Sequence, residues 1–79
     1  MNHRSLRTDV RNPVLALPSI VELKSLDQAS RKALALVLGD IAQDARGRAE
    51  KCWRTHKAPM AAYWKAVAVY AGHLKRAIR

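Results

Sequence analysis

The stretch "THKAP", residues 55–59, constrains the fold most, because it interrupts a sequence whose pattern is otherwise helical. Pro59 disfavours helical geometry at Ala58, and it is itself suited to the first turn of a new helix. The pattern therefore predicts that one helix ends here and another begins. A short connection between two long helices predicts an antiparallel hairpin.

The helix before this break is predicted over residues 27–55, which gives a length of about 43 Å. Apolar or small side chains recur there at steps of three or four and so share one stripe of the helix: Leu34, Leu38, Ile41, Ala45, Ala49 and Cys52. The stripe continues across Gly39 and Gly47, although a kink at either glycine would fit the sequence. Asp27, or Ser25 paired with Gln28, is suited to cap the start.

The helix after the break is predicted over residues 59–79. A helical wheel places one set of side chains within about a third of the circumference: Met60, Tyr63, Trp64, Val67, Tyr70, Ala71, Leu74 and Ile78. We expect this set to form the core against the preceding helix, with Trp53 and the other aromatic rings closing the ends of an alanine-rich interface. The alternative is that Tyr63 or Trp64 stacks on nucleic-acid bases.

The N-terminal segments carry different signals. Residues 1–12 contain three arginines and few large apolar groups, which predicts a mobile basic arm. The segment "PVLALP", residues 13–18, is predicted to be extended, because its prolines disfavour a helix. Ser19 and Glu22 have the spacing of a capping box, which predicts a short helix over residues 20–25. The chain thus divides into an arm and extended segment, 1–18, and a helical domain, 19–79.

The fold class predicted is all-α: a long antiparallel helical hairpin preceded by a short capped helix and an extended basic arm. Seventy-nine residues suffice for a single small core. Two helices leave much of their apolar stripe uncovered, so we expect packing against the short helix or against a second copy in a homodimer.

The sequence offers little for catalysis or for a cofactor. Cys52 and His56 are four residues apart, which would place them on one helix face, and His73 and His3 lie elsewhere. A zinc site needs three or four ligands within reach, and a cysteine nucleophile needs a pocket and an orienting group. We therefore expect no enzyme, no metal and no cofactor. A single cysteine and the absence of a signal sequence or an apolar span of about 20 residues suggest a soluble cytoplasmic protein.

Charge is distributed unevenly along the chain. Residues 1–45 contain six Lys or Arg and five Asp or Glu, whereas residues 46–79 contain nine and one, within a total net charge of +9. Such an excess in one half favours an anionic partner over a merely solvated surface. The predicted partner-binding residues form two groups, one of Arg46, Arg54, Lys57 and Lys65 and a C-terminal one of Lys75, Arg76 and Arg79. Part of the C-terminal group would also oppose the helix dipole.

Two segments, "RNPVLALPSIVEL" and "RAEKCWRTHKAPMAAYWKAVAVYAGH", resemble small proteins carried by prophages and other mobile elements of proteobacteria. In size, alanine richness and helical content, the chain is similar to helical anti-CRISPR proteins that act on type I systems. These inhibitors share no common motif, so the resemblance assigns no site residue. Many of them are acidic mimics of DNA, whereas this chain is basic.

The resemblance implies a phage-encoded, non-enzymatic inhibitor that binds a type I CRISPR surveillance complex in the cytoplasm of the bacterial host. A basic inhibitor would dock on an acidic protein face or on exposed nucleic acid of that complex. The alternative is a small DNA- or RNA-binding regulator of a mobile element, with weak sequence specificity because no helix-turn-helix pattern is present. A third interpretation, a helix lying on a membrane surface, is disfavoured because intramolecular packing accounts for the aromatic stripe.

Overall fold

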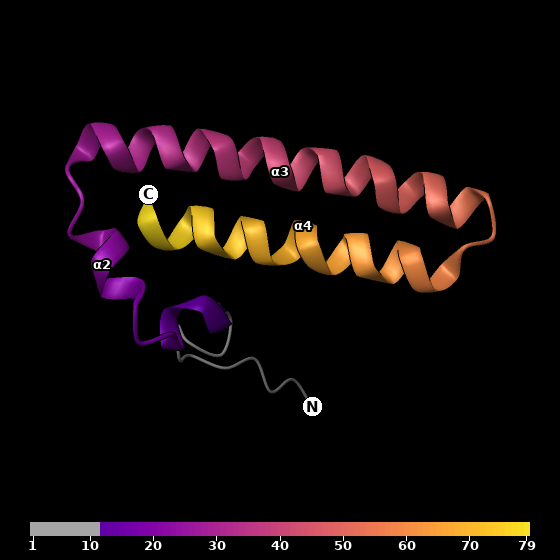
Figure 1. The fold of residues 1–79 in the computed structure, drawn as a ribbon, viewed down its shortest axis with the longest axis horizontal. Helices are drawn as coiled ribbons and strands as arrows, with labels where there is room; N and C mark the ends of the chain where they lie inside the picture. Colours follow the sequence, from indigo (N-terminus) through magenta and orange to yellow (C-terminus); the bar gives the residue numbers. More distant parts are fainter. Residues whose placement is uncertain (1–11) are drawn as a thin grey trace, which may run out of the picture.

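A computed structural model of the chain describes residues 12–79, and these form an all-α fold. The elements are a 3-10 turn η1 (Pro13–Ala16), a short helix α2 (Ile20–Lys24) and two long helices, α3 (Gln28–Arg54) and α4 (Ala58–Ile78). The long helices pack side by side in opposite directions, and η1 and α2 lie beside the C-terminal end of α4 (Figure 1). The predicted hairpin is confirmed. The basic arm predicted over residues 1–12 lies outside the described residues, except for Asn12.

Helix α3 begins and ends close to its predicted limits. The Asp27 side chain caps it by accepting hydrogen bonds from the backbone N–H of Ser30 (3.2 Å) and from its hydroxyl (2.6 Å). These two bonds, the hydroxyl first, lower the pKa of the Asp27 carboxyl. The helix continues through Gly39 and Gly47 without interruption. Two ion pairs on its exposed surface, Arg48 with Asp44 and Arg54 with Glu50, both at 2.7 Å, support its second half.

The turn between α3 and α4 is a Schellman motif. The backbone N–H of Lys57 donates to the carbonyl of Cys52 (2.8 Å), and that of His56 donates to the carbonyl of Trp53 (3.2 Å). These bonds require a left-handed residue at position 56, and His56 has a φ of 61°. Pro59 then lies in the first turn of α4, as predicted. Cys52 and His56 therefore do not share a helix face as predicted, because α3 ends at Arg54.

The N-terminal segment differs from two predictions. Residues Pro13–Ala16 form a 3-10 turn and are not extended. The hydrogen bonds of this turn run from the N–H of Leu15 to the carbonyl of Asn12 and from the N–H of Leu17 to the carbonyl of Val14, so no proline N–H is needed. The predicted capping box does not form either. Ser19 has φ −85° and ψ 2°, not the extended backbone that the motif needs, and its side chain makes no capping bond.

Small side chains form the seam between the long helices. Buried and half-buried residues recur there at steps of three and four: Ala35, Leu38, Ala42, Ala45, Ala49 and Cys52 on α3, and Ala61, Trp64, Ala68, Ala71, Lys75 and Ile78 on α4. This is the heptad spacing of an antiparallel coiled coil. Because most of these side chains are alanine, the two backbones can approach closely.

The prediction that the aromatic rings form the core is wrong. Trp53 is 68% exposed, Tyr63 and Tyr70 are each 55% exposed, and Trp64 is half-buried. In α4 the large apolar side chains form a second row, also spaced by three and four, beside the alanine row: Met60, Tyr63, Val67, Tyr70 and Leu74. Both rows fit the periodicity of a helix. The alanine row lets the two helices approach more closely, so it forms the contact between them.

The most buried part of the core lies at the open end of the hairpin, where η1 and α2 add a third layer. Val14 and Ile78 are almost fully buried and belong to one cluster with Ile20, Leu38 and Ala77. Asn12 is buried beside them and donates a hydrogen bond from Nδ2 to the carbonyl of His73 (3.0 Å), which ties η1 to α4. The expected packing against the short helix is thus present at this end only.

Candidate partner-binding site

Four of the predicted partner-binding residues line one groove between the long helices. Arg46 comes from α3, and Lys75, Arg76 and Arg79 come from α4. We call this the basic groove and define it by these four residues. It encloses about 410 Å³. Its floor contains Gly39 and Gly72 together with Ala42, so small side chains make the depression that the cations surround.

Lys75 lies in the seam between the two helices and not on the open surface of α4. Its half-buried side chain crosses over α3 at Gly39, where a Cβ atom would lie 3.1 Å from the Lys75 Nζ. Gly39 therefore provides the space through which the Lys75 stem passes between the helices. This arrangement holds the ammonium group in the groove, while its apolar stem covers the seam.

The groove keeps its positive charge. Among residues 12–79, the ion pairs are Arg48 with Asp44 and Arg54 with Glu50, and neither includes a cation of the basic groove. Asp40 also lines the groove, without forming an ion pair there. Nη2 of Arg76 lies 3.1 Å from Nδ1 of His73, within hydrogen-bonding distance, and this contact orients the guanidinium without bringing a carboxylate to it.

The other three predicted residues lie toward the turn. Arg54 is paired with Glu50, and Lys57 is the N-cap residue of α4. Lys65 lines a separate shallow depression beside Trp53. The sequence interpretation grouped Arg46 with these three, but the structure places it with the C-terminal cations.

Two cations on the same face were missed by the sequence interpretation. Arg31 and Lys32, in the first turns of α3, lie beside Lys75 and Arg79 in a neighbouring pocket. The signal that could have found them is the register of the hairpin. Since the chain reverses near residue 56, residues close to 33 must face residues close to 79.

The opposite side of the hairpin is apolar. We call it the apolar face and define it by Val37, Ile41, Met60, Tyr63, Val67 and Tyr70. A shallow groove with no charged lining residue runs along it between α3 and α4. Toward the turn, Tyr63 meets the edge of Trp64 at a centroid distance of 5.1 Å, and the Arg48 guanidinium lies 5.1 Å from the Trp64 ring centre.

The described residues offer no assembled centre for a metal. Within residues 12–79, no three His, Cys, Asp or Glu side chains are grouped as metal ligands. Cys52 is a half-buried free thiol in the seam. Over the same residues, no helix has the length and apolar character needed to cross a membrane. What the surface offers chemically is a set of fixed cations that can bind an anion.

Comparisons of the chain with protein-family models, with curated proteins and with solved structures find no match.

Proposed function

We propose that this protein is a non-enzymatic binding protein that docks its basic groove on an anionic macromolecular surface. The observation that carries the proposal is the convergence of Arg46, Lys75, Arg76 and Arg79 from two helices on one groove, where none of them forms an ion pair with an acidic residue of the described chain. The helices fix the backbone positions of these four cations, so binding has to order only their side chains, and their combined positive charge favours an anionic partner.

The resemblance of the chain to helical anti-CRISPR proteins suggests the partner. In this proposal a phage-encoded inhibitor occupies an acidic protein face, or exposed nucleic acid, of a type I CRISPR surveillance complex in the cytoplasm of the host. It acts by steric occupation and needs no cofactor.

The experiment is plasmid interference by type I complexes of several subtypes, with and without the protein. We expect inhibition by the wild type and its loss in the variant with Arg46→Glu and Arg76→Glu. The matched control is Lys51→Glu, an exposed cation of α3 that lines none of the pockets on the basic side. If the wild type leaves interference unaffected in every subtype, the CRISPR complex is not the partner. If the wild type, the double variant and Lys51→Glu inhibit equally, the basic groove is not the binding site.

The alternative function is binding to bare DNA or RNA. It is favoured by the extent of the cations, which continue from Arg31 and Lys32 through the basic groove to Lys65 along one side of the hairpin. If four cations contact phosphates, the affinity should fall roughly 100-fold between 50 and 200 mM salt. A mobility-shift assay at these two concentrations checks this. Absence of binding at low salt favours the protein partner.

A further inference from the structure

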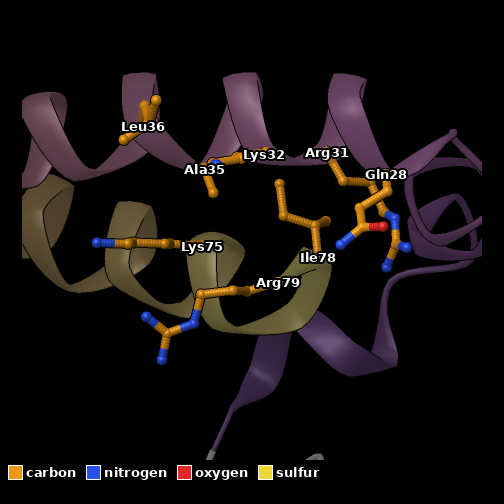
Figure 2. A pocket seen from close by; sticks show the side chains of 8 residues that line it. All are labelled: Gln28, Arg31, Lys32, Ala35, Leu36, Lys75, Ile78 and Arg79. Atoms are coloured by element: carbon orange, nitrogen blue, oxygen red, sulfur yellow. The ribbon is translucent and has the colours of Figure 1, made fainter.

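A second pocket lies between the first turns of α3 and the last turns of α4, next to the basic groove. We call it the end pocket and define it by its lining residues: Gln28, Arg31, Lys32, Ala35, Leu36, Lys75, Ile78 and Arg79. It encloses about 420 Å³, which is within the range of ligand pockets. Figure 2 shows the aliphatic side chains of Ala35 and Ile78 pointing toward each other from the two helices.

The end pocket combines two chemical features. The aliphatic floor consists of Ala35 and Ile78, both almost fully buried, and of Leu36, which is 64% exposed and therefore supplies nearly all of its accessible apolar surface. Four cations, Arg31, Lys32, Lys75 and Arg79, also line the pocket, and no acidic side chain of residues 12–79 does. In this respect the end pocket differs from the basic groove, which contains Asp40.

Arg31 is a half-buried cation in the lining of the end pocket. Its Nε atom is buried and has no hydrogen-bond partner among the described residues. A buried donor without an acceptor is costly, because the group has lost its water without replacement. Because that atom has no surface that a ligand oxygen could reach, a carboxylate in the pocket would bind Arg31 through the remaining N–H groups of its guanidinium and would meet the surrounding positive charge.

The floor discriminates between anionic partners. Proteins that bind single-stranded nucleic acid stack the bases on aromatic rings, and among the described residues no aromatic side chain lines the end pocket. A sugar-phosphate backbone laid across Leu36 would cover an aliphatic surface with polar groups. A leucine-sized side chain beside carboxylates matches both the floor and the charges.

We infer that the end pocket binds an acidic peptide segment of the partner protein, with an apolar side chain on the floor and adjacent carboxylates against the cations. This inference rests on the proposed binding function and specifies the partner as a protein. It makes Leu36 a specificity-determining residue and Arg31 a carboxylate ligand.

The probe is a short fluorescein-labelled peptide with one leucine flanked on both sides by Asp and Glu, titrated with the full chain by fluorescence anisotropy. The matched peptide replaces the leucine with serine at the same charge, and an oligonucleotide of equal charge is the third probe. We expect the leucine peptide to bind about tenfold more tightly than the serine peptide.

The variants are Leu36→Ser and its neighbour Val37→Ser, which is similarly exposed but lies on the apolar face. We expect Leu36→Ser to abolish the preference for leucine, whereas Val37→Ser keeps it. Arg31→Gln should weaken both peptides. Equal circular dichroism spectra show that the variants are folded.

Equal affinity for the leucine and serine peptides, or tighter binding of the oligonucleotide, would overturn the inference. The proposed function has a separate readout, because its variants at Arg46 and Arg76 lie outside the end pocket. If those variants abolish interference inhibition while Leu36→Ser inhibits normally, the basic groove stands and the end pocket does not.

Discussion

At the scale of single residues, the least typical backbone belongs to His56. Its φ of 61° lies in the left-handed region, which side chains with a Cβ enter at a cost. The turn requires this conformation, because two hydrogen bonds back to Cys52 and Trp53 depend on it. Glycine is the residue that usually occupies this position.

We therefore expect His56→Gly to raise the free energy of unfolding by about 1 kcal/mol, because glycine enters the left-handed region without a steric cost. Urea denaturation followed by circular dichroism measures the change. The matched control is Lys51→Gly, in the regular helix one turn earlier, which should lower stability by about 1 kcal/mol. A loss of stability in His56→Gly would show that the imidazole itself supports the turn.

The negative charge of Asp27 strengthens the hydrogen bonds that cap helix α3. Hydrogen bonds from Ser30 lower the pKa of its carboxyl below the ordinary value of 3.8. A carboxyl with a lower pKa in the folded state contributes stability above its unfolded pKa, and this stability is lost as the pH falls through the folded value. The cap should therefore weaken below about pH 4.

The test compares Asp27→Asn with the wild type at pH 7 and pH 3. Asparagine caps a helix well but does not titrate, so the variant should lose less stability on acidification than the wild type. Asp27→Ala removes the cap and should cost about 1 kcal/mol at pH 7. Identical acid sensitivity of the wild type and Asp27→Asn would show that the other carboxylates account for the whole pH dependence.

At the scale of helices, local signals predict the elements well and the packing less well. The limits of α3 and α4 follow from Asp27, Pro59 and the helical periodicity, because caps and prolines act over only a few residues. On α3 the predicted stripe shares Leu38, Ala45, Ala49 and Cys52 with the seam. On α4 the predicted stripe shares Trp64, Ala71 and Ile78 with it, but includes the exposed Tyr63 and Tyr70 and omits Ala68. Tyr63 and Tyr70 have a larger apolar surface area than Ala68 and Ala71. A prediction that ranks side chains by size therefore selects the row of the tyrosines.

The candidate site shows the same limit. The sequence alone indicates that cations gather in the C-terminal half, but it does not indicate which of them share a groove. That depends on the register of the hairpin, which brings Lys75 over Gly39. The contribution of Gly39 is spatial, and no charge or periodicity signal marks it.

The alanine seam makes a direct prediction for α4. Ala68→Leu inserts a large side chain where Ala68 is only 3% exposed, so we expect it to lower the free energy of unfolding by about 1–3 kcal/mol. The control is Ala66→Leu, an exposed position of the same helix, which should change stability by less than about 0.5 kcal/mol. Urea denaturation measures the free energy of unfolding of both variants. If Ala68→Leu proves as stable as Ala66→Leu, the helices do not meet along this row.

At the scale of the whole molecule, the hairpin has two opposite faces of different chemistry. The basic groove and the end pocket occupy one, and the apolar face occupies the other. On the apolar face, η1 and α2 contribute only at the open end, so Ile41, Tyr63 and Tyr70 stay exposed. Association through this face would leave the cations of the basic groove and the end pocket of both copies directed outward, which limits electrostatic repulsion between two highly basic chains.

We therefore expect a weak homodimer formed through the apolar face. The exposed parts of its large side chains amount to roughly 500 Å² per copy, and about 1,000 Å² in a pair is the lower limit for a specific interface. Sedimentation velocity over a range of concentrations measures the equilibrium. The double variant Tyr63→Ser and Tyr70→Ser should remain monomeric, because it removes the two largest exposed rings of this face.

The control for this prediction is Trp53→Ser, which removes a still more exposed ring. Trp53 lies beside Lys65 on the side of the basic groove, so its loss should leave the dimer intact. A wild type that is monomeric at every concentration would mean that the apolar face stays open to solvent. A dimer lost only in Trp53→Ser would place the contact on the basic side, where it would compete with the anionic partner.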